Sequence, residues 1–149
     1  MRAQPSILLI EDEPYLLHNL QMLLQNEGYR VIATCDSADG IKQLEAQGFD
    51  LVITDLVMPG IDGFQILDYL QTHRPETVVV AVTGYISPES AIEAQRRGAC
   101  GCITKPFDYD VLKTAIERAL EKACLHKRHG SAARAGPEGG ERASPSADY

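Results

Sequence analysis

Short apolar runs alternate along this chain with segments whose apolar residues recur at helical spacing. The runs are rich in β-branched residues and lack polar alternation, as expected for strands that are buried on both faces. They cover Ile7–Ile10, Val31–Ala33, Leu51–Ile53, Val78–Val82 and Cys100–Ile103. This pattern predicts a parallel sheet covered by helices.

A helix is expected after each run, because start signals and apolar stripes follow at suitable distances. The start and stop signals are the stripe Leu16–Leu24 ended by Gly28, a cap at Ser37, the stripe Phe64–Leu70, Ser87 with Pro88, and a cap at Asp108. Repeated β–α units with right-handed crossovers predict an α/β fold, a doubly wound five-stranded parallel sheet between five helices. The fourth helix offers mainly alanines for burial, so we expect it to be the most loosely held.

The chain of 149 residues is long enough for one domain and an extra segment. We expect residues 1–5 to be a short tail and residues 6–125 to form the domain. Residues 126–149 should be a disordered tail or linker, since from Gly130 onward no large aliphatic residue occurs.

Composition narrows the class of protein. Apolar residues make up 44% and charged residues 23%, which is ordinary for a soluble globular domain. No apolar run approaches the roughly 18 residues of a membrane span, and the start lacks an apolar signal core, so we expect a cytoplasmic protein without membrane contact. The net charge of −7 is the sum of −8 over residues 1–125 and +1 over residues 126–149, and the acidic domain argues against nucleic acid contact.

The cysteines do not follow a metal-binding or disulfide pattern. They are Cys35, Cys100, Cys102 and Cys124. Cys100 and Cys102 are expected on one face of a strand as buried free thiols, because nothing cationic beside them suggests a lowered thiol pKa.

Polar residues stand directly after four of the apolar runs. Glu11 and Asp12 follow the first, Asp55 the third, Thr83 the fourth and Lys105 the fifth. In an open parallel sheet the carboxyl ends of the strands share one edge, where ligands bind. We therefore expect carboxylates, a hydroxyl and an ammonium to line one pocket.

That set of groups suits a divalent cation and a phosphoryl group. Clustered carboxylates repel one another, and Mg²⁺ compensates them with oxygen ligands. A carboxylate such as Asp55 is a competent nucleophile toward phosphorus, and Thr83 and Lys105 can contact phosphoryl oxygens. Alternatively, Glu11 and Asp12 only lie at the N-terminus of a helix, where the helix dipole favours acidic side chains. Asp55 at the end of another strand favours the metal site.

Four motifs in this order make the chain resemble the receiver domain of bacterial two-component response regulators, the CheY-like family. They are ILLIEDE, LVITDLVMPGIDGFQIL, VVVAVTGY and CITKPFD, and the resemblance covers residues 6–125. It implies the strand order 2-1-3-4-5 and a flavodoxin-like three-layer sandwich. The implied roles are phosphoacceptor for Asp55, Mg²⁺ binding by Glu11, Asp12, Asp55 and the Val57 carbonyl, switch hydroxyl for Thr83 and phosphate contact for Lys105.

The resemblance also implies partners. A sensor histidine kinase or phosphotransfer protein would donate the phosphoryl group, and the surface of the fourth helix, fifth strand and fifth helix would respond, with a homodimer through that surface as one option. The output would pass through a downstream protein target or through an effector domain that this sequence does not include, and the sequence identifies neither. The chain would catalyse only its own aspartyl phosphorylation and dephosphorylation. Cys102 departs from the pattern, since the family usually has Tyr or Phe there.

Two other functions compete with this one. A pseudo-receiver would keep the fold as a phosphorylation-independent interaction module, and Cys102 lends it weight, but the intact set of site residues opposes it. An aspartyl phosphatase would need a second acid/base Asp close after the nucleophile. Position 57 is Val, which argues against that class.

Overall fold

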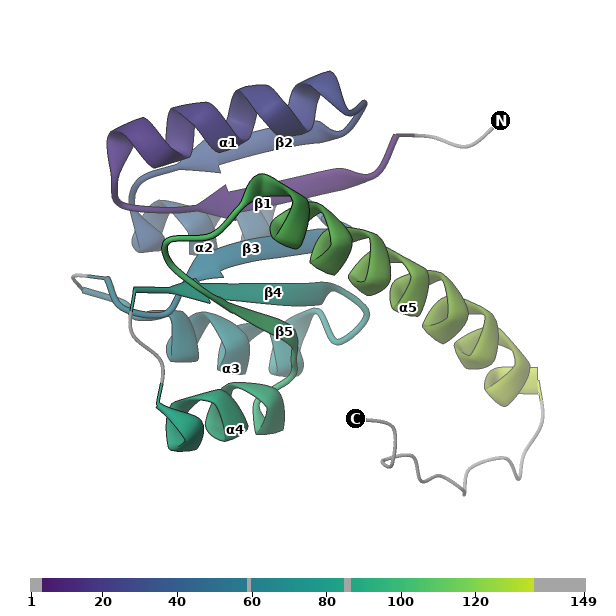
Figure 1. The fold of residues 1–149 in the computed structure, drawn as a ribbon. Helices are drawn as coiled ribbons and strands as arrows, with labels where there is room; N and C mark the ends of the chain where they lie inside the picture. Colours follow the sequence, from purple (N-terminus) through teal and green to yellow (C-terminus); the bar gives the residue numbers. More distant parts are fainter. Residues whose placement is uncertain (1–3, 59, 85–86, 136–149) are drawn as a thin grey trace.

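A five-stranded parallel sheet forms the centre of the molecule (Figure 1). The computed structural model describes residues 4–58, 60–84 and 87–135, with side chains up to residue 123. The strands are β1 (Ser6–Ile10), β2 (Arg30–Thr34), β3 (Leu51–Asp55), β4 (Val78–Thr83) and β5 (Ala99–Thr104). Their order is β2-β1-β3-β4-β5, which confirms the predicted topology.

Five helices cover the two faces of this sheet. They are α1 (Pro14–Asn26), α2 (Ser37–Ala46), α3 (Gly63–His73), α4 (Pro88–Arg96) and α5 (Tyr109–Ala135). Helices α1 and α5 pack on one face, and α2, α3 and α4 lie on the other (Figure 1). The predicted α/β doubly wound fold is confirmed.

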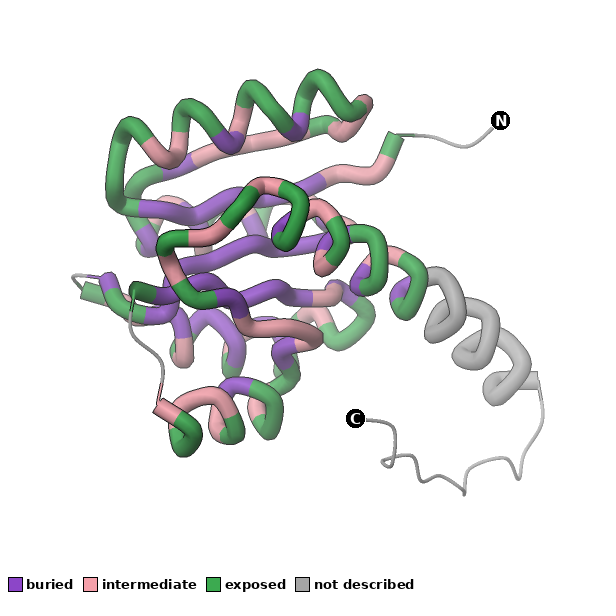
Figure 2. The backbone as a smooth tube through the Cα atoms, viewed as in Figure 1, coloured by how far each residue is buried: buried purple, intermediate pink, exposed green. Residues whose placement is uncertain are grey.

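Each face of the sheet has its own apolar core, since successive strand residues point to opposite sides. Ile7 and Leu9 of β1 pack with Leu20 of α1 and Ile116 of α5. On the other face Leu8 packs in the cluster that includes helices α2 and α3. The central strands are buried along their length (Figure 2), which explains their unbroken apolar pattern.

Two helix ends differ from the sequence-based expectation. The N-cap of α2 is Asp36, whose carboxylate accepts from the Ala38 N–H, and Ser37 is the first helical residue, so the predicted Ser37 cap is wrong. Both residues are good caps, and sequence alone did not separate them. Helix α5 continues to Ala135, past the domain end expected at 125. Residues 136–149, the remainder of the expected tail, lie outside the described residues.

The expectation that Cys100 and Cys102 share a face is also wrong. The register between β4 and β5 shifts between Val79 and Val80, which pair with Ala99 and Gly101. The extra residue, Cys100, turns toward the α1–α5 side, and Cys102 packs on the opposite side. A bulge of this kind breaks the alternation of a regular strand. Burial raises the pKa of both thiols, as expected for half-buried free cysteines.

Helix α4 is held by few apolar contacts, as predicted. Ala94 is its buried residue, and the side chain of Ile92 is exposed. Arg97, at its C-cap, pairs with Asp68 of α3 at 3.1 Å and lies over the ring of Phe64 at 5.3 Å. Polar and cation–π contacts therefore help to hold α4 against α3.

Candidate functional site

The strand ends meet at one edge of the sheet, as the sequence predicted. Ile10 of β1 is in register with Thr54 of β3, and Thr83 of β4 is in register with Thr104 of β5. Because Glu11, Asp55 and Lys105 stand at or just beyond these positions, the topology brings them together from three strands.

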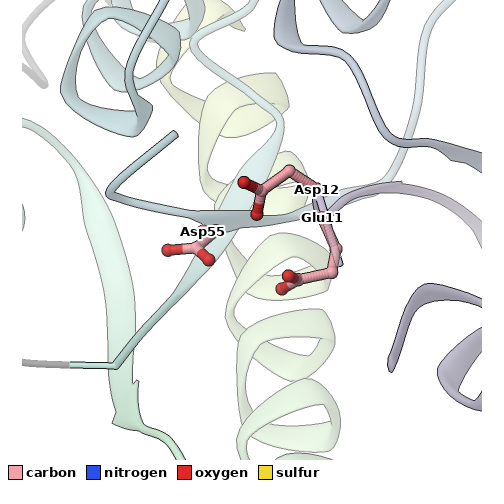
Figure 3. Close-up of side chains that lie close together, drawn as sticks. All are labelled: Glu11, Asp12 and Asp55. Atoms are coloured by element: carbon pink, nitrogen blue, oxygen red, sulfur yellow. The ribbon is translucent and has the colours of Figure 1, made fainter. Parts of the chain in front are cut away.

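Three carboxylates cluster at this edge (Figure 3). One oxygen of each of Glu11, Asp12 and Asp55 lies within 4.8 Å of the others. Asp55 is 5% exposed and Glu11 2% exposed, whereas Asp12 is exposed to solvent. Two buried acids therefore lie beneath one that faces water, so the cluster is open on the Asp12 side.

Lys105 provides the cation that faces the buried acids. Its Nζ donates to Asp55 Oδ2 at 2.9 Å and to Glu11 Oε2 at 3.0 Å. Burial by itself would lower the pKa of Lys105, but the hydrogen bonds to Asp55 and Glu11 outweigh it and raise that pKa. The ammonium stays charged at neutral pH and links the two carboxylates.

Glu11 is held by a second donor, the Glu13 N–H, at 3.1 Å from Oε2. Burial nevertheless raises the pKa of Glu11, because removal from water outweighs the contacts with Lys105 and Glu13. A charged carboxylate in this position is therefore not fully compensated by the described protein groups.

The loop after β3 orients Asp55. The Val57 N–H donates to Asp55 Oδ1 at 3.0 Å, so both oxygens of Asp55 accept a hydrogen bond. The Leu56 N–H donates to the Val82 carbonyl at 2.9 Å and anchors the start of the loop to β4. The side chain of Val57 is exposed. The predicted role of its carbonyl as a metal ligand stays a prediction.

Thr83 and Lys105 are joined through the backbone. The Lys105 N–H donates to the Thr83 carbonyl at 2.7 Å, and Thr83 is fully buried at the end of β4. The Lys105–Pro106 peptide bond is cis, the isomer that the sequence left open. The structure thus places the predicted hydroxyl and ammonium on neighbouring strand ends.

The donor set fits a hard divalent cation. Three carboxylates supply oxygen ligands, and one ammonium compensates only part of their charge. Mg²⁺ is bound by one or two carboxylates together with water and phosphate oxygens, which matches two buried acids beside an exposed one. Glu11, Asp12 and Asp55 are the residues that would hold it.

Comparison with known proteins gives the family. The model of the response regulator receiver domain matches residues 7–117. The chain belongs to this family. It is similar to the transcriptional regulatory protein GlrR of Escherichia coli (strain K12), with 38% identity over 117 residues, which are 78% of this chain and 26% of the relative.

Solved structures agree with this membership. A CheY-like receiver domain from Methanospirillum hungatei JF-1 has a TM-score of 0.79 at 27% identity and covers 83% of this chain and 98% of its own. NtrX from Brucella abortus has a TM-score of 0.79 at 33% identity, covering 88% of this chain and 30% of its own. The receiver domain thus spans about a quarter of the length of its curated relatives.

Within the described part of the chain, no helix has the length and apolar character needed to cross a membrane.

Sequence reasoning missed the backbone donors of this receiver domain. The Glu13 and Val57 N–H groups orient Glu11 and Asp55. Every residue except proline has a backbone N–H, so the residue type does not show which one acts as a donor. The signal that was present is positional, since each donor lies two residues after the acid that it contacts.

Proposed function

We propose that this receiver domain accepts a phosphoryl group on Asp55 from a phosphohistidine of a sensor histidine kinase or phosphotransfer protein, in the presence of Mg²⁺. The observation that carries the proposal is the position of Asp55. Its buried carboxylate clusters with those of Glu11 and Asp12, and the Lys105 ammonium bridges it to Glu11. A cytoplasmic location follows from such a donor.

Transfer to Asp55 exchanges one bond to phosphorus for another. A carboxylate oxygen forms the new O–P bond as the N–P bond of the phosphohistidine breaks. The imidazole keeps the electron pair of that bond and takes a proton from water. Hydrolysis resets the domain when a water oxygen bonds to phosphorus and the Asp55 O–P bond breaks, which gives carboxylate, inorganic phosphate and a proton.

The residues around Asp55 have separate tasks. Glu11 and Asp12 would hold Mg²⁺, which when bound neutralises charge on the phosphoryl oxygens. Lys105, already 2.9 Å from Asp55 Oδ2, is placed to pair with a phosphoryl oxygen. Thr83, on the neighbouring strand end, would donate its hydroxyl to another. Catalysis is confined to the domain's own acyl phosphate.

The output surface proposed for the switch is made by α4, β5 and α5. Its β5–α5 side carries a groove of about 510 Å³, and Cys102, Phe107 and Val111 are among the residues that line it. Cys102 stands where the family usually has an aromatic ring, so the surface has a smaller side chain at this position. This surface is where a homodimer or a downstream protein would bind.

Intact-mass analysis after incubation with acetyl phosphate tests the proposal. We expect the gain of one phosphoryl group that requires Mg²⁺ and is absent in Asp55→Asn, a nearly isosteric change. The Asp68→Asn variant, on the outer side of α3, is the matched control and should be labelled normally. A folded protein that gains nothing under any condition would instead be a phosphorylation-independent interaction module.

A further inference from the structure

Helix α3 begins directly against the backbone of the acceptor residue. Its N-cap is Asp62, which forms a reciprocal capping box with Gln65, and Gly63 is its first residue. The Gly63 N–H donates to the Leu56 carbonyl at 3.0 Å, so the loop that starts after Asp55 closes on itself. This closure places the helix start beside the end of β3.

A side chain at position 63 has no room. A Cβ built there would lie 2.4 Å from the Asp55 carbonyl oxygen and 2.6 Å from the Leu56 Cα. Both are backbone atoms and neither can rotate away. The Leu56 side chain adds a third close contact, at 3.0 Å from its Cδ2.

Space, and not backbone conformation, requires glycine at this position. Gly60, in the same loop, has a positive φ of 78°, but Gly63 does not fall in the left-handed region. An alanine in ordinary helical conformation is normally favoured over glycine by about 0.5–1 kcal/mol. If Gly63 served only the helix, its replacement by alanine would therefore stabilise the protein.

We propose that Gly63 is a positioning residue for phosphoryl transfer, because it lets α3 pack against the backbone of Asp55 and so fixes the orientation of that carboxylate. The proposal rests on the proposed function of Asp55. An added methyl group must push the helix start and the strand end apart. The Leu56 N–H is tied to β4 through Val82, so the loop segment that carries the Val57 N–H takes up much of the shift.

The Gly63→Ala variant tests this, with Gly48→Ala as the matched control, because a Cβ at Gly48 meets nothing within 4 Å. A misplacement of about 1 Å can cost roughly 100-fold in rate. We expect Gly63→Ala to slow phosphorylation by acetyl phosphate by at least about tenfold at saturating Mg²⁺. The Val57 amide resonance should shift as its bond to Asp55 Oδ1 lengthens, while Gly48→Ala leaves both unchanged.

Unchanged rate and unchanged Val57 resonance in a folded Gly63→Ala protein would overturn the proposal. If that variant does not fold, Asp55→Asn supplies the test, since contact predicts that the Gly63 and Val57 amide resonances both move. A Gly63 amide resonance that does not shift in Asp55→Asn would contradict the proposal. If the wild type accepts no phosphoryl group, the proposed function fails, and the Val57 resonance still decides whether Gly63 positions Asp55.

Discussion

Lys105 donates to Asp55 at 2.9 Å although the two residues lie on different strand ends, and the same ammonium reaches Glu11 at 3.0 Å. One cation therefore serves two buried acids. Removal of a partner from a buried ionic contact leaves the other charge without compensation, which costs more than the contact itself contributes. The contact makes Lys105 part of the fold as well as of the site.

Lys105→Ala should destabilise the metal-free protein by about 2 kcal/mol, because Asp55 and Glu11 lose their cation. Urea denaturation in the presence of a chelator measures this. The loss should shrink when Mg²⁺ is added, since the cation compensates the same acids. Lys113→Ala is the control, because Lys113 pairs with Glu27 at 3.6 Å on the surface. Lys113→Ala should change the free energy of unfolding by no more than about 0.5 kcal/mol. An equal loss of stability in both variants would contradict this explanation.

Glu11→Gln should change how stability depends on pH. Burial raises the pKa of Glu11, so the folded protein binds a proton there more readily than the unfolded chain does. The stability that this group contributes is complete below its unfolded pKa and is lost as pH rises through its folded pKa. In metal-free buffer the wild type should therefore lose more free energy of unfolding than Glu11→Gln does as the pH is raised through this window. Parallel curves for the two proteins would contradict this explanation.

Arg97 should control the local stability of α4. Arg97→Ala removes the contacts with Asp68 and with the Phe64 ring, which connect α4 to α3, as well as the ion pair with Glu93 of α4 at 2.7 Å. Amide hydrogen exchange over Pro88–Arg96 should become about fivefold faster, while β1 is unaffected. Arg96→Ala is the matched control, because Arg96 pairs only with Glu93 of its own helix among the described ion pairs. Equal acceleration in both variants would show that Arg97 has no special part.

The thiols should differ in their rate of alkylation. Cys35 is exposed, whereas Cys100 and Cys102 are partly buried and have raised pKa values, which reduces their thiolate fraction. Treatment with iodoacetamide at pH 8, followed by peptide mass mapping, should label Cys35 before Cys100 and Cys102. Faster labelling of Cys102 than of Cys35 would show that β5 is more open than the structure indicates.

The sheet was predictable because buried parallel strands have an unbroken apolar pattern. The site was predictable for a related reason. Polar residues such as Asp55 and Lys105 stand at the ends of those strands, and the topology of a parallel sheet brings strand ends together. Chain-local information was enough for both features, and the resemblance to the receiver family supplied the strand order.

What the sequence did not reveal depends on contacts between distant parts of the backbone. The bulge at Cys100 comes from the pairing of β4 with β5, and residue types do not show a register shift. The close approach of Gly63 to the Asp55 carbonyl comes from the path of a loop. The sharing of one ammonium by Asp55 and Glu11 likewise requires coordinates, since Lys105 is far from both in the chain.

The central claim is that Asp55 is the phosphoryl acceptor, and borohydride trapping tests it most directly. Borohydride reduces an acyl phosphate to an alcohol and so converts a phosphorylated aspartate to homoserine, which peptide sequencing by mass spectrometry locates. After incubation with acetyl phosphate and Mg²⁺, we predict homoserine at position 55, with Asp12 and Asp50 unchanged. Homoserine at another aspartate, or none in a protein that has gained a phosphoryl group, would contradict the claim.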